Sequence, residues 1–441
     1  MGRLLCPALL TAGALALAAG FTLFAAVAFG GSPQVTGQDR RASTPVRPAV
    51  AASAGDIPSL QTRLQQTPGD HRSWSRLALA YVEEARVSAD PTYYRKADEA
   101  LARAAELAPD DALQLTARAA LDNARHDFAA ALEAADAAVA ANPFSSLAHQ
   151  LRSDALTELG RYAEARRAAR QADDVEPGPS TFARLSYQAE LRGDLAEADR
   201  LMRLARDAST GSAPAYAFAA FHLGELARGT GDLTAAGRHY AAALDADPDF
   251  SPALAGRARL AVARGQTAAA LRDYREVVRR LPLPEYVTEL GELYLALGRD
   301  AEARAQFAVA EASAALARAN GVGVDLEVAL FEADHGSAEA ALAAAREEWA
   351  ARRSIHTADA LGWALHAAGR DAEALPYVRR ATRLGTRDAR MLFHHGAVAA
   401  ALGRTGEARE QLRAALAVDN GVAPLRESQA RALLAGLGGA R

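Results

Sequence analysis

Proline residues recur along this chain at a fixed interval. One interval of 34 residues separates Pro109 from Pro143, Pro143 from Pro177, and Pro248 from Pro282. A single period over a long chain marks a stack of similar supersecondary units, and this period is typical of a helix–turn–helix repeat. The spacing therefore predicts an all-α chain built from stacked helix pairs.

The composition agrees with a repeat stack. The chain has 441 residues, half of them hydrophobic, which would be large for one globular core. In a stack each unit buries its apolar face only against its neighbours, so a long chain needs no single core. The formal charge of −4 argues against a nucleic-acid-binding protein, which usually has a basic domain. The only cysteine, Cys6, excludes an internal disulfide and a cysteine-based metal site.

Residues 1–29 are predicted to form a signal peptide or a membrane-anchor helix. The segment from Leu4 to Phe29 is uncharged and long enough to span a bilayer. Ala26-Val27-Ala28 would suit cleavage, whereas the length of the apolar run favours an uncleaved anchor. We therefore expect an exported protein, secreted or anchored at the membrane. The arginines that follow the segment favour the alternative, a cytoplasm-facing membrane protein, under the positive-inside rule.

Residues 30–56 are rich in Gly, Ser, Pro, Thr and Ala, which predicts a disordered linker. Ten units can then be placed in one phase over residues 57–437. Asp90-Pro91 interrupts the first unit and predicts a longer loop between its helices. The eighth unit is degenerate, and the polar segment 424–437 is predicted to be a helix that caps the open end of the stack.

The positions between the prolines carry a recognisable pattern. The fifth unit is nearly complete, with Leu223, Gly224, Ala236, Tyr240 and Pro248. This pattern resembles the tetratricopeptide-repeat (TPR) family over roughly residues 57–437. The resemblance implies a right-handed α-solenoid whose first helices line a concave groove that binds protein partners.

The outward positions of the first helices supply candidate partner-binding residues. Acids and aromatic side chains dominate this surface, which predicts a neutral or basic partner with apolar anchors. The acids are Glu190, Glu225, Glu292 and Asp359, and the aromatic residues are Tyr187, Phe218, Phe221, Trp363 and Phe393. The alternative is that the aromatic residues pack between units and that the acids are solvated. On the binding hypothesis, Phe221→Ala with Glu225→Arg should weaken partner capture and leave the helices intact.

A weaker pattern could indicate a metal site in the last two units. His356, Asp359 and His366 share one face of a helix, and His394 lies in the matching helix of the next unit. Such ligands could hold zinc or nickel. However, His356 and His366 are two to three turns apart, so we expect core or surface histidines and no cofactor.

Catalysis finds little support in the sequence. The chain contains no Walker loop, no G-x-S-x-G and no H-E-x-x-H. His126-Asp127 looks like a hydrolase pair but occupies the turn at which other units have Gly-Asp. We therefore expect a binding protein and not an enzyme.

Overall fold

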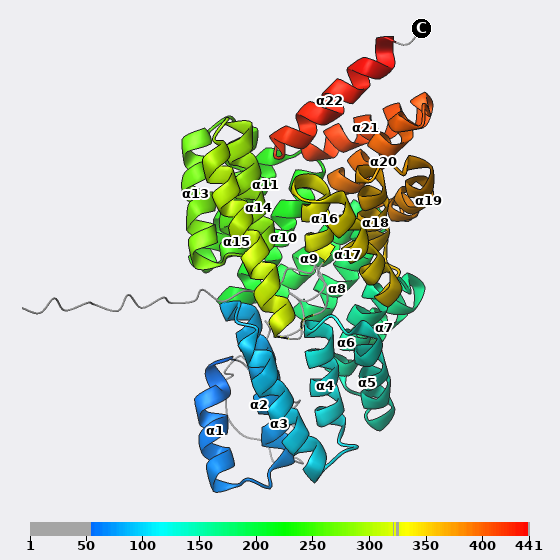
Figure 1. Cartoon of the computed structure of the whole chain (residues 1–441). Coiled ribbons are helices and arrows are strands. Elements are labelled where there is room, and N and C mark those ends of the chain that lie inside the picture. The colour runs from blue at the N-terminus through cyan, green and yellow to red at the C-terminus, as the bar shows by residue number, and fades with distance from the viewer. Residues whose placement is uncertain (1–53, 321, 323–325, 440–441) are drawn as a thin grey trace, which may run out of the picture.

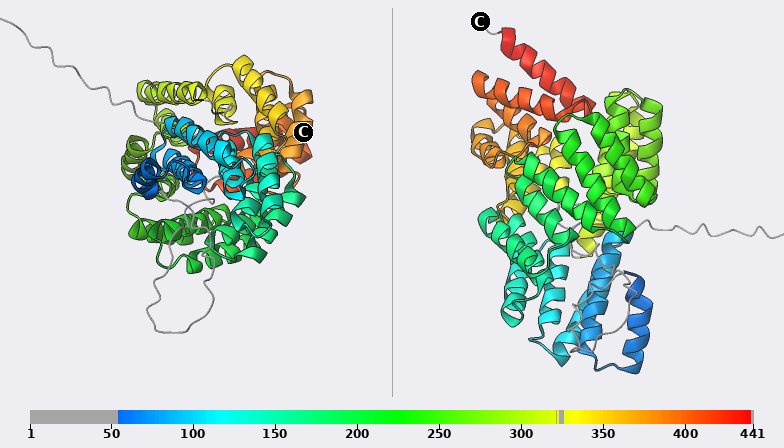
Figure 2. Two further views of the ribbon diagram at one scale, coloured as in Figure 1. Left: turned by 90° about the horizontal axis from the view of Figure 1, so that it is seen from below. Right: turned by 180° about the vertical axis from the view of Figure 1, so that it is seen from behind.

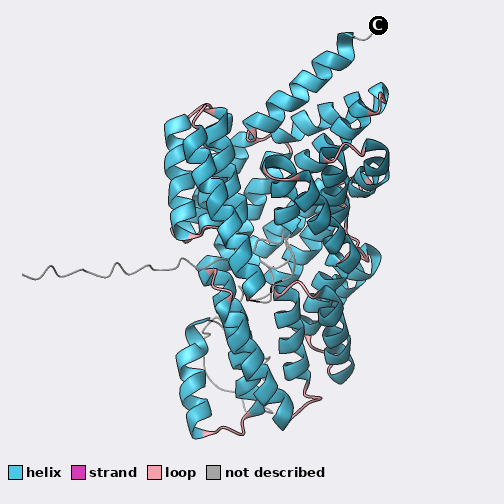
Figure 3. Ribbon diagram, in the orientation of Figure 1, coloured by secondary structure: helices cyan, strands magenta, loops and turns pink. Residues whose placement is uncertain are grey.

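The computed structural model describes residues 54–320, 322 and 326–439. The described residues form α-helices joined by short turns, with one short 3-10 helix and no strand (Figure 3). The predicted N-terminal apolar helix and most of the predicted linker lie outside the described residues. None of the described helices is long and apolar enough to cross a membrane.

Twenty of the helices form ten antiparallel pairs. A 3-10 helix (Ala54–Asp56) and α1 (Ile57–Gln66) precede the pairs, and α22 (Pro424–Gly439) follows them at the opposite end of the molecule (Figure 1). The paired helices are α2 (His71–Ser88) with α3 (Thr92–Leu107), α4 (Ala112–Ala124) with α5 (Phe128–Ala141), α6 (Ser146–Glu158) with α7 (Tyr162–Val175), α8 (Pro179–Glu190) with α9 (Leu195–Ala208), α10 (Ala213–Gly229) with α11 (Leu233–Ala246), α12 (Ser251–Ala263) with α13 (Thr267–Arg280), α14 (Pro284–Ala296) with α15 (Asp300–Ala319), α16 (Leu326–His335) with α17 (Ala338–Ala351), α18 (Ile355–Ala367) with α19 (Asp371–Thr382), and α20 (Ala389–Ala401) with α21 (Thr405–Asp419).

In three pairs the turn between the helices follows from two adjacent residues. Gly193 has a φ of +71°, a left-handed conformation that ends α8 at little steric cost. The next residue, Asp194, caps α9 because its side chain accepts a hydrogen bond from the Glu197 amide at 3.2 Å. The same turn occurs at His126, which has a φ of +64°, and Asp127 then caps α5. The predicted turn role of His126-Asp127 is thus confirmed.

The first helix of each pair lies inside the stack and the second lies outside. Nearly every residue of α6 and α12 is buried, including polar ones, whereas α7 and α11 bury a single stripe of alanines and a few larger residues. Seen from below, the pairs follow one another around the molecule (Figure 2). The inner layer therefore consists of the even-numbered helices from α2 to α20.

The stack winds so tightly that successive turns of it touch. The Ile355 amide donates a hydrogen bond to the Tyr162 hydroxyl at 2.7 Å, across 193 residues of sequence. The Asn420 side-chain amide donates to the Arg228 carbonyl at 3.3 Å, across 192 residues. Two contacts with nearly equal separations show that the chain returns to the same side after between five and six repeats. We call this line of contacts the inter-turn seam.

Two departures from the repeat pattern have local causes. The extra residues of the first unit lengthen α2 to 18 residues and leave only three residues, 89–91, before α3. The predicted longer loop was therefore wrong: the insertion continues the helix because Leu, Ala, Glu and Arg are good helix formers. In the seventh unit α15 has 20 residues, whereas α11 and α13 have 14 each.

Candidate partner-binding site

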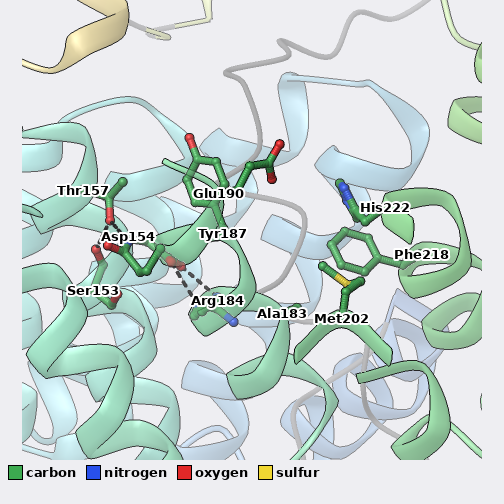
Figure 4. Close-up of a pocket in the computed structure, with 11 residues that line it drawn as sticks. Ser153, Asp154, Thr157, Ala183, Arg184, Tyr187, Glu190, Met202, Phe218 and His222 are labelled. Carbon is green, nitrogen blue, oxygen red and sulfur yellow. Dashed lines mark hydrogen bonds and ion pairs between the residues drawn. The ribbon is translucent and has the colours of Figure 1, made fainter. Parts of the chain in front are cut away.

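A small cavity opens on the inner wall where α6, α8 and α10 meet (Figure 4). Its volume is about 20 Å³, roughly enough for one water molecule. Three of the predicted groove residues line it: Tyr187 and Glu190 from α8, and Phe218 from α10. The structure therefore brings together residues that are about one repeat apart in the sequence, as the stacking of inner helices requires.

The floor of this cavity is a closed polar network. The Arg184 guanidinium forms an ion pair with Asp154 at 2.7 Å and donates to the Gln150 side chain at 2.8 Å. The Gln188 side chain donates to the Thr157 hydroxyl at 2.7 Å. These buried partners satisfy one another, so the network fixes how α6 and α8 stack.

Glu190 stands apart from the other acids of the inner wall. Among the described residues its half-buried carboxyl has neither an ion pair nor a hydrogen bond. Burial, together with the nearby Glu225 and Asp388 carboxylates, raises the pKa of Glu190 to about 8, although Arg228 partly opposes the shift. At neutral pH this carboxyl is therefore mostly protonated, and a cation brought next to it would favour its ionisation.

The raised pKa predicts how stability depends on pH. The folded chain keeps a proton on Glu190 that the unfolded chain releases above its ordinary pKa of 4.5, so this residue reduces stability as pH rises from 4.5 to about 8. Glu190→Gln removes that dependence. Because the side chain is only half-buried, we expect the variant to be more stable than the wild type by about 2 kcal/mol at pH 9, and by little at pH 5. Denaturation curves at both pH values measure this difference, and parallel pH profiles would contradict the prediction.

The other predicted groove acids are engaged within the chain. Glu225 pairs with Arg228 at 2.9 Å, Glu292 contacts His335 Nε2 at 3.0 Å, and Asp359 contacts His394 Nδ1 at 3.0 Å. The alternative of solvated acids is thus wrong for these three side chains. They hold the wall together, which leaves Glu190 as the acid of this set open to a partner.

Glu225 shows why its charge cannot be reversed without damage. Burial would raise the pKa of Glu225, but Arg228 and Arg259 outweigh that effect and lower the pKa to about 2. The buried Tyr240 hydroxyl also donates to this carboxylate. An arginine at position 225 would face two buried cations, so Phe221→Ala with Glu225→Arg would destabilise the helices. The structure therefore changes the expectation from the sequence: we now expect this double change to lower stability as well as partner capture.

Some of the predicted aromatic residues are buried in the core of the helix packing, and the others are half-buried on the inner wall. Phe218 and Phe393 are buried within the helix packing, with 3% and 4% of their surface exposed. Phe221 is half-buried and packs against the Phe250 ring at 6.0 Å. Trp363 stacks on the His394 ring at 4.0 Å and donates a hydrogen bond to Asp334 at 2.7 Å. Packing between units, the alternative weighed from the sequence, therefore describes most of these rings.

The four candidate metal ligands do not converge on one point. His356 Nε2 lies 3.3 Å from the Tyr187 hydroxyl, His366 contacts Asp371, and His394 contacts Asp359. Within the described ranges, no group of three His, Cys, Asp or Glu side chains could hold a metal ion. Of the three histidines, His394 is buried, whereas His356 and His366 are half-buried.

The sequence did not reveal the residues of the inter-turn seam. Arg352 forms ion pairs with Glu158, on the preceding turn, and with Glu348 of its own helix at 2.6 Å. Both carboxylates are almost completely buried. No local pattern could have paired residues 194 positions apart, because the pairing depends on the rotation accumulated over several repeats.

The helix pairs form an α-solenoid, the fold that the TPR resemblance implies. No protein-family model matches the chain, and neither does any curated protein. The chain is similar to several solved TPR proteins. One, from Parabacteroides merdae, is 20% identical, with 59% of this chain and 98% of that chain covered and a TM-score of 0.33.

Two further solved structures are similar over different lengths. The pilF protein of Pseudomonas aeruginosa is 18% identical, with 48% of this chain and 93% of that chain covered and a TM-score of 0.37. The APC/C hetero-tetramer Cut9–Hcn1 contains a chain that is 14% identical, with 86% and 92% covered and a TM-score of 0.39. TM-scores this low carry no argument about the function of the chain.

Proposed function

We propose that this protein is a scaffold that binds a protein partner along the inner wall of its TPR solenoid. The observation that carries the proposal is Glu190, a half-buried carboxyl with no ion pair on a wall whose other named acids are paired. A lysine or arginine of a partner would supply the missing cation. The apolar parts of Tyr187 and Phe221, both half-buried, would supply contact area beside it.

The charge of this wall favours a basic partner over an acidic one. Glu285 pairs with Arg259, and 40% of its side chain is exposed. Arg259 itself is shared between Glu285 and Glu289, at 2.6 and 2.8 Å. Two carboxyl groups thus share one guanidinium here, and a basic segment would supply the second cation that they lack.

A selection of random peptides displayed on phage tests this proposal. Peptides selected on the wild type should be rich in Lys or Arg next to aliphatic or aromatic residues. The same selection on Glu190→Gln should lose the preference for the basic residue, and selected peptides should bind this variant about tenfold more weakly. Equal binding to both proteins would reject Glu190 as the contact.

The pH dependence of that binding is a second, independent expectation. A cation binds the ionised carboxylate, so a peptide must displace the proton that Glu190 holds below pH 8. Affinity for a basic peptide should therefore rise between pH 6 and pH 8.5 in the wild type. It should stay level in Glu190→Gln, as measured by fluorescence anisotropy of the labelled peptide.

We further propose that the scaffold is not an enzyme and works outside the cytoplasm, secreted or anchored through residues 1–29. The uncharged run from Leu4 to Phe29 supports this location. A topology reporter fused after Arg441 tests it. Activity of an exported reporter fits the proposal, whereas activity of a cytoplasmic reporter would support the alternative, a membrane adaptor that faces the cytoplasm.

A further inference from the structure

A second opening lies on the described part of the chain, away from Glu190, where the seventh and eighth units meet. It is a cavity of about 370 Å³ between α14, α15, α16 and α17. This volume falls within the range of pockets that enclose ligands. Its apolar surface includes Ala314 of α15, Val328 and Phe331 of α16, and Ala344 of α17. We call it the α15–α17 groove.

The groove exists because small side chains line the helices that face it. These are Ala310 and Ala314 of α15 and Ala340, Ala343 and Ala344 of α17. Alanines at the facing positions fill little of the space that remains. Phe331 is held at the groove by edge-on contact with Phe307 at 5.5 Å, so the groove has a fixed apolar wall.

The polar rim of the groove is acidic. Glu311, Glu327, Glu332 and Glu347 line it, with Arg318 as the single cation. Glu327 lies 3.5 Å from Arg390, and Glu332 accepts a hydrogen bond from the Ser337 amide at 3.0 Å. Glu311 and Glu347 are exposed and have no ion pair among the described residues. An apolar floor with an acidic rim suits an apolar segment that carries positive charge at its edges.

We propose that the α15–α17 groove binds a basic amphipathic helix of a partner protein, with its aliphatic side chains in the groove and its lysines or arginines at the rim. Such a helix presents aliphatic residues four positions apart on one face, as in other helix-in-groove complexes. The charge complementarity selects a basic helix, because an acidic one would place like charges next to Glu311 and Glu347. This site does not depend on Glu190.

A synthetic peptide tests the proposal directly. The probe is a labelled alanine-rich helix with two leucines four residues apart and lysines beside them. One matched peptide has glutamate in place of lysine, and another has serine in place of leucine. We expect the first peptide to bind the full chain and both matched peptides to bind at least about tenfold more weakly. Absence of binding by the first peptide, or equal binding of the glutamate peptide, would overturn the proposal.

Three variants locate the binding site. Ala344→Phe fills the groove and should weaken binding of the leucine–lysine peptide about tenfold. Glu347→Arg should weaken it by a similar factor because it repels the lysines of the peptide. Glu133→Arg, an exposed acid on α5, should leave affinity unchanged. Glu347→Arg changes an exposed side chain, so it remains informative if thermal melting shows that Ala344→Phe unfolds. Normal binding by folded Ala344→Phe or by Glu347→Arg would overturn the assignment.

Glu190→Gln separates this proposal from the scaffold function of the inner wall. The variant should bind the leucine–lysine peptide as the wild type does. If Glu190→Gln no longer binds the peptide and Glu347→Arg still does, the peptide docks on the inner wall and the groove proposal fails. If Glu347→Arg no longer binds the peptide and Glu190→Gln still does, the groove is the binding site. That conclusion holds whether or not the inner wall also binds a partner.

Discussion

Replacing Arg352 with methionine is expected to lower the free energy of unfolding by about 3 to 5 kcal/mol. Arg352 is buried and pairs with Glu158 on one turn of the solenoid and with Glu348 on the next, at 2.6 Å for the second pair. Its guanidinium also lies 5.0 Å from the centre of the Phe128 ring. Methionine would fill part of the space but leave two carboxylates buried without their cation.

The matched control is Arg370→Met on the outer surface. Arg370 pairs with Glu373 at 2.6 Å, but 37% and 58% of the two side chains are exposed. An exposed pair contributes at most about 1 kcal/mol, so denaturant unfolding should distinguish the two variants clearly. Adding Glu158→Gln to Arg352→Met should recover part of the loss, because it removes one of the two buried carboxylates that lose the Arg352 cation. A loss no greater than that of Arg370→Met would show that the seam pair contributes little.

Arg352→Met also tests whether a change in one repeat alters the local stability of a repeat on another turn of the solenoid. In a linear stack, each repeat contacts only its neighbours, so a change at Arg352 should not reach α6. Here Arg352 contacts Glu158, at the end of α6, across 194 residues. We therefore expect faster amide hydrogen exchange in α6 when Arg352 is replaced, and unchanged exchange there for Arg370→Met.

The local structure could be predicted from the sequence because it is set by local chemistry. Gly193-Asp194 ends one helix and caps the next, and the period of the prolines places each pair. The close approach of helices was also visible, since a side chain at Gly224 would lie 2.4 Å from the Tyr240 ring. Residues within one repeat of each other were therefore assigned to the correct helix and layer.

The candidate site could be predicted only in part. Its residues on α8 and α10 were found because inner helices stack at the repeat period. Which acids are paired was not predictable, because Glu292 and Asp359 meet histidines, whose positions follow no repeat pattern. The α15–α17 groove was missed because the eighth unit gave too weak a signal to place α16 and α17.

The second large loss of stability is expected when Gly160, on the inter-turn seam, is replaced by alanine. Gly160 has a φ of +74°, and an added Cβ would lie 2.3 Å from the Arg353 carbonyl oxygen on the next turn. Gly298 has a φ of +69° and open space around its Cβ position. Both glycines occupy equivalent turns, so they differ mainly in whether another turn of the solenoid lies against them.

Alanine at Gly298 should cost about 1 kcal/mol, because the left-handed conformation disfavours a side chain. Alanine at Gly160 meets the same penalty and also forces the backbone of residues 353–354 away, so we expect a total of about 3 kcal/mol. Denaturant unfolding of the two variants side by side measures the difference. If the seam closes in solution as it does here, that difference measures the cost of displacing residues 353–354 from their contact with Gly160. If both variants lose the same amount, the turns of the solenoid are apart in solution, and the inner wall around Glu190 is then open along its length to a partner.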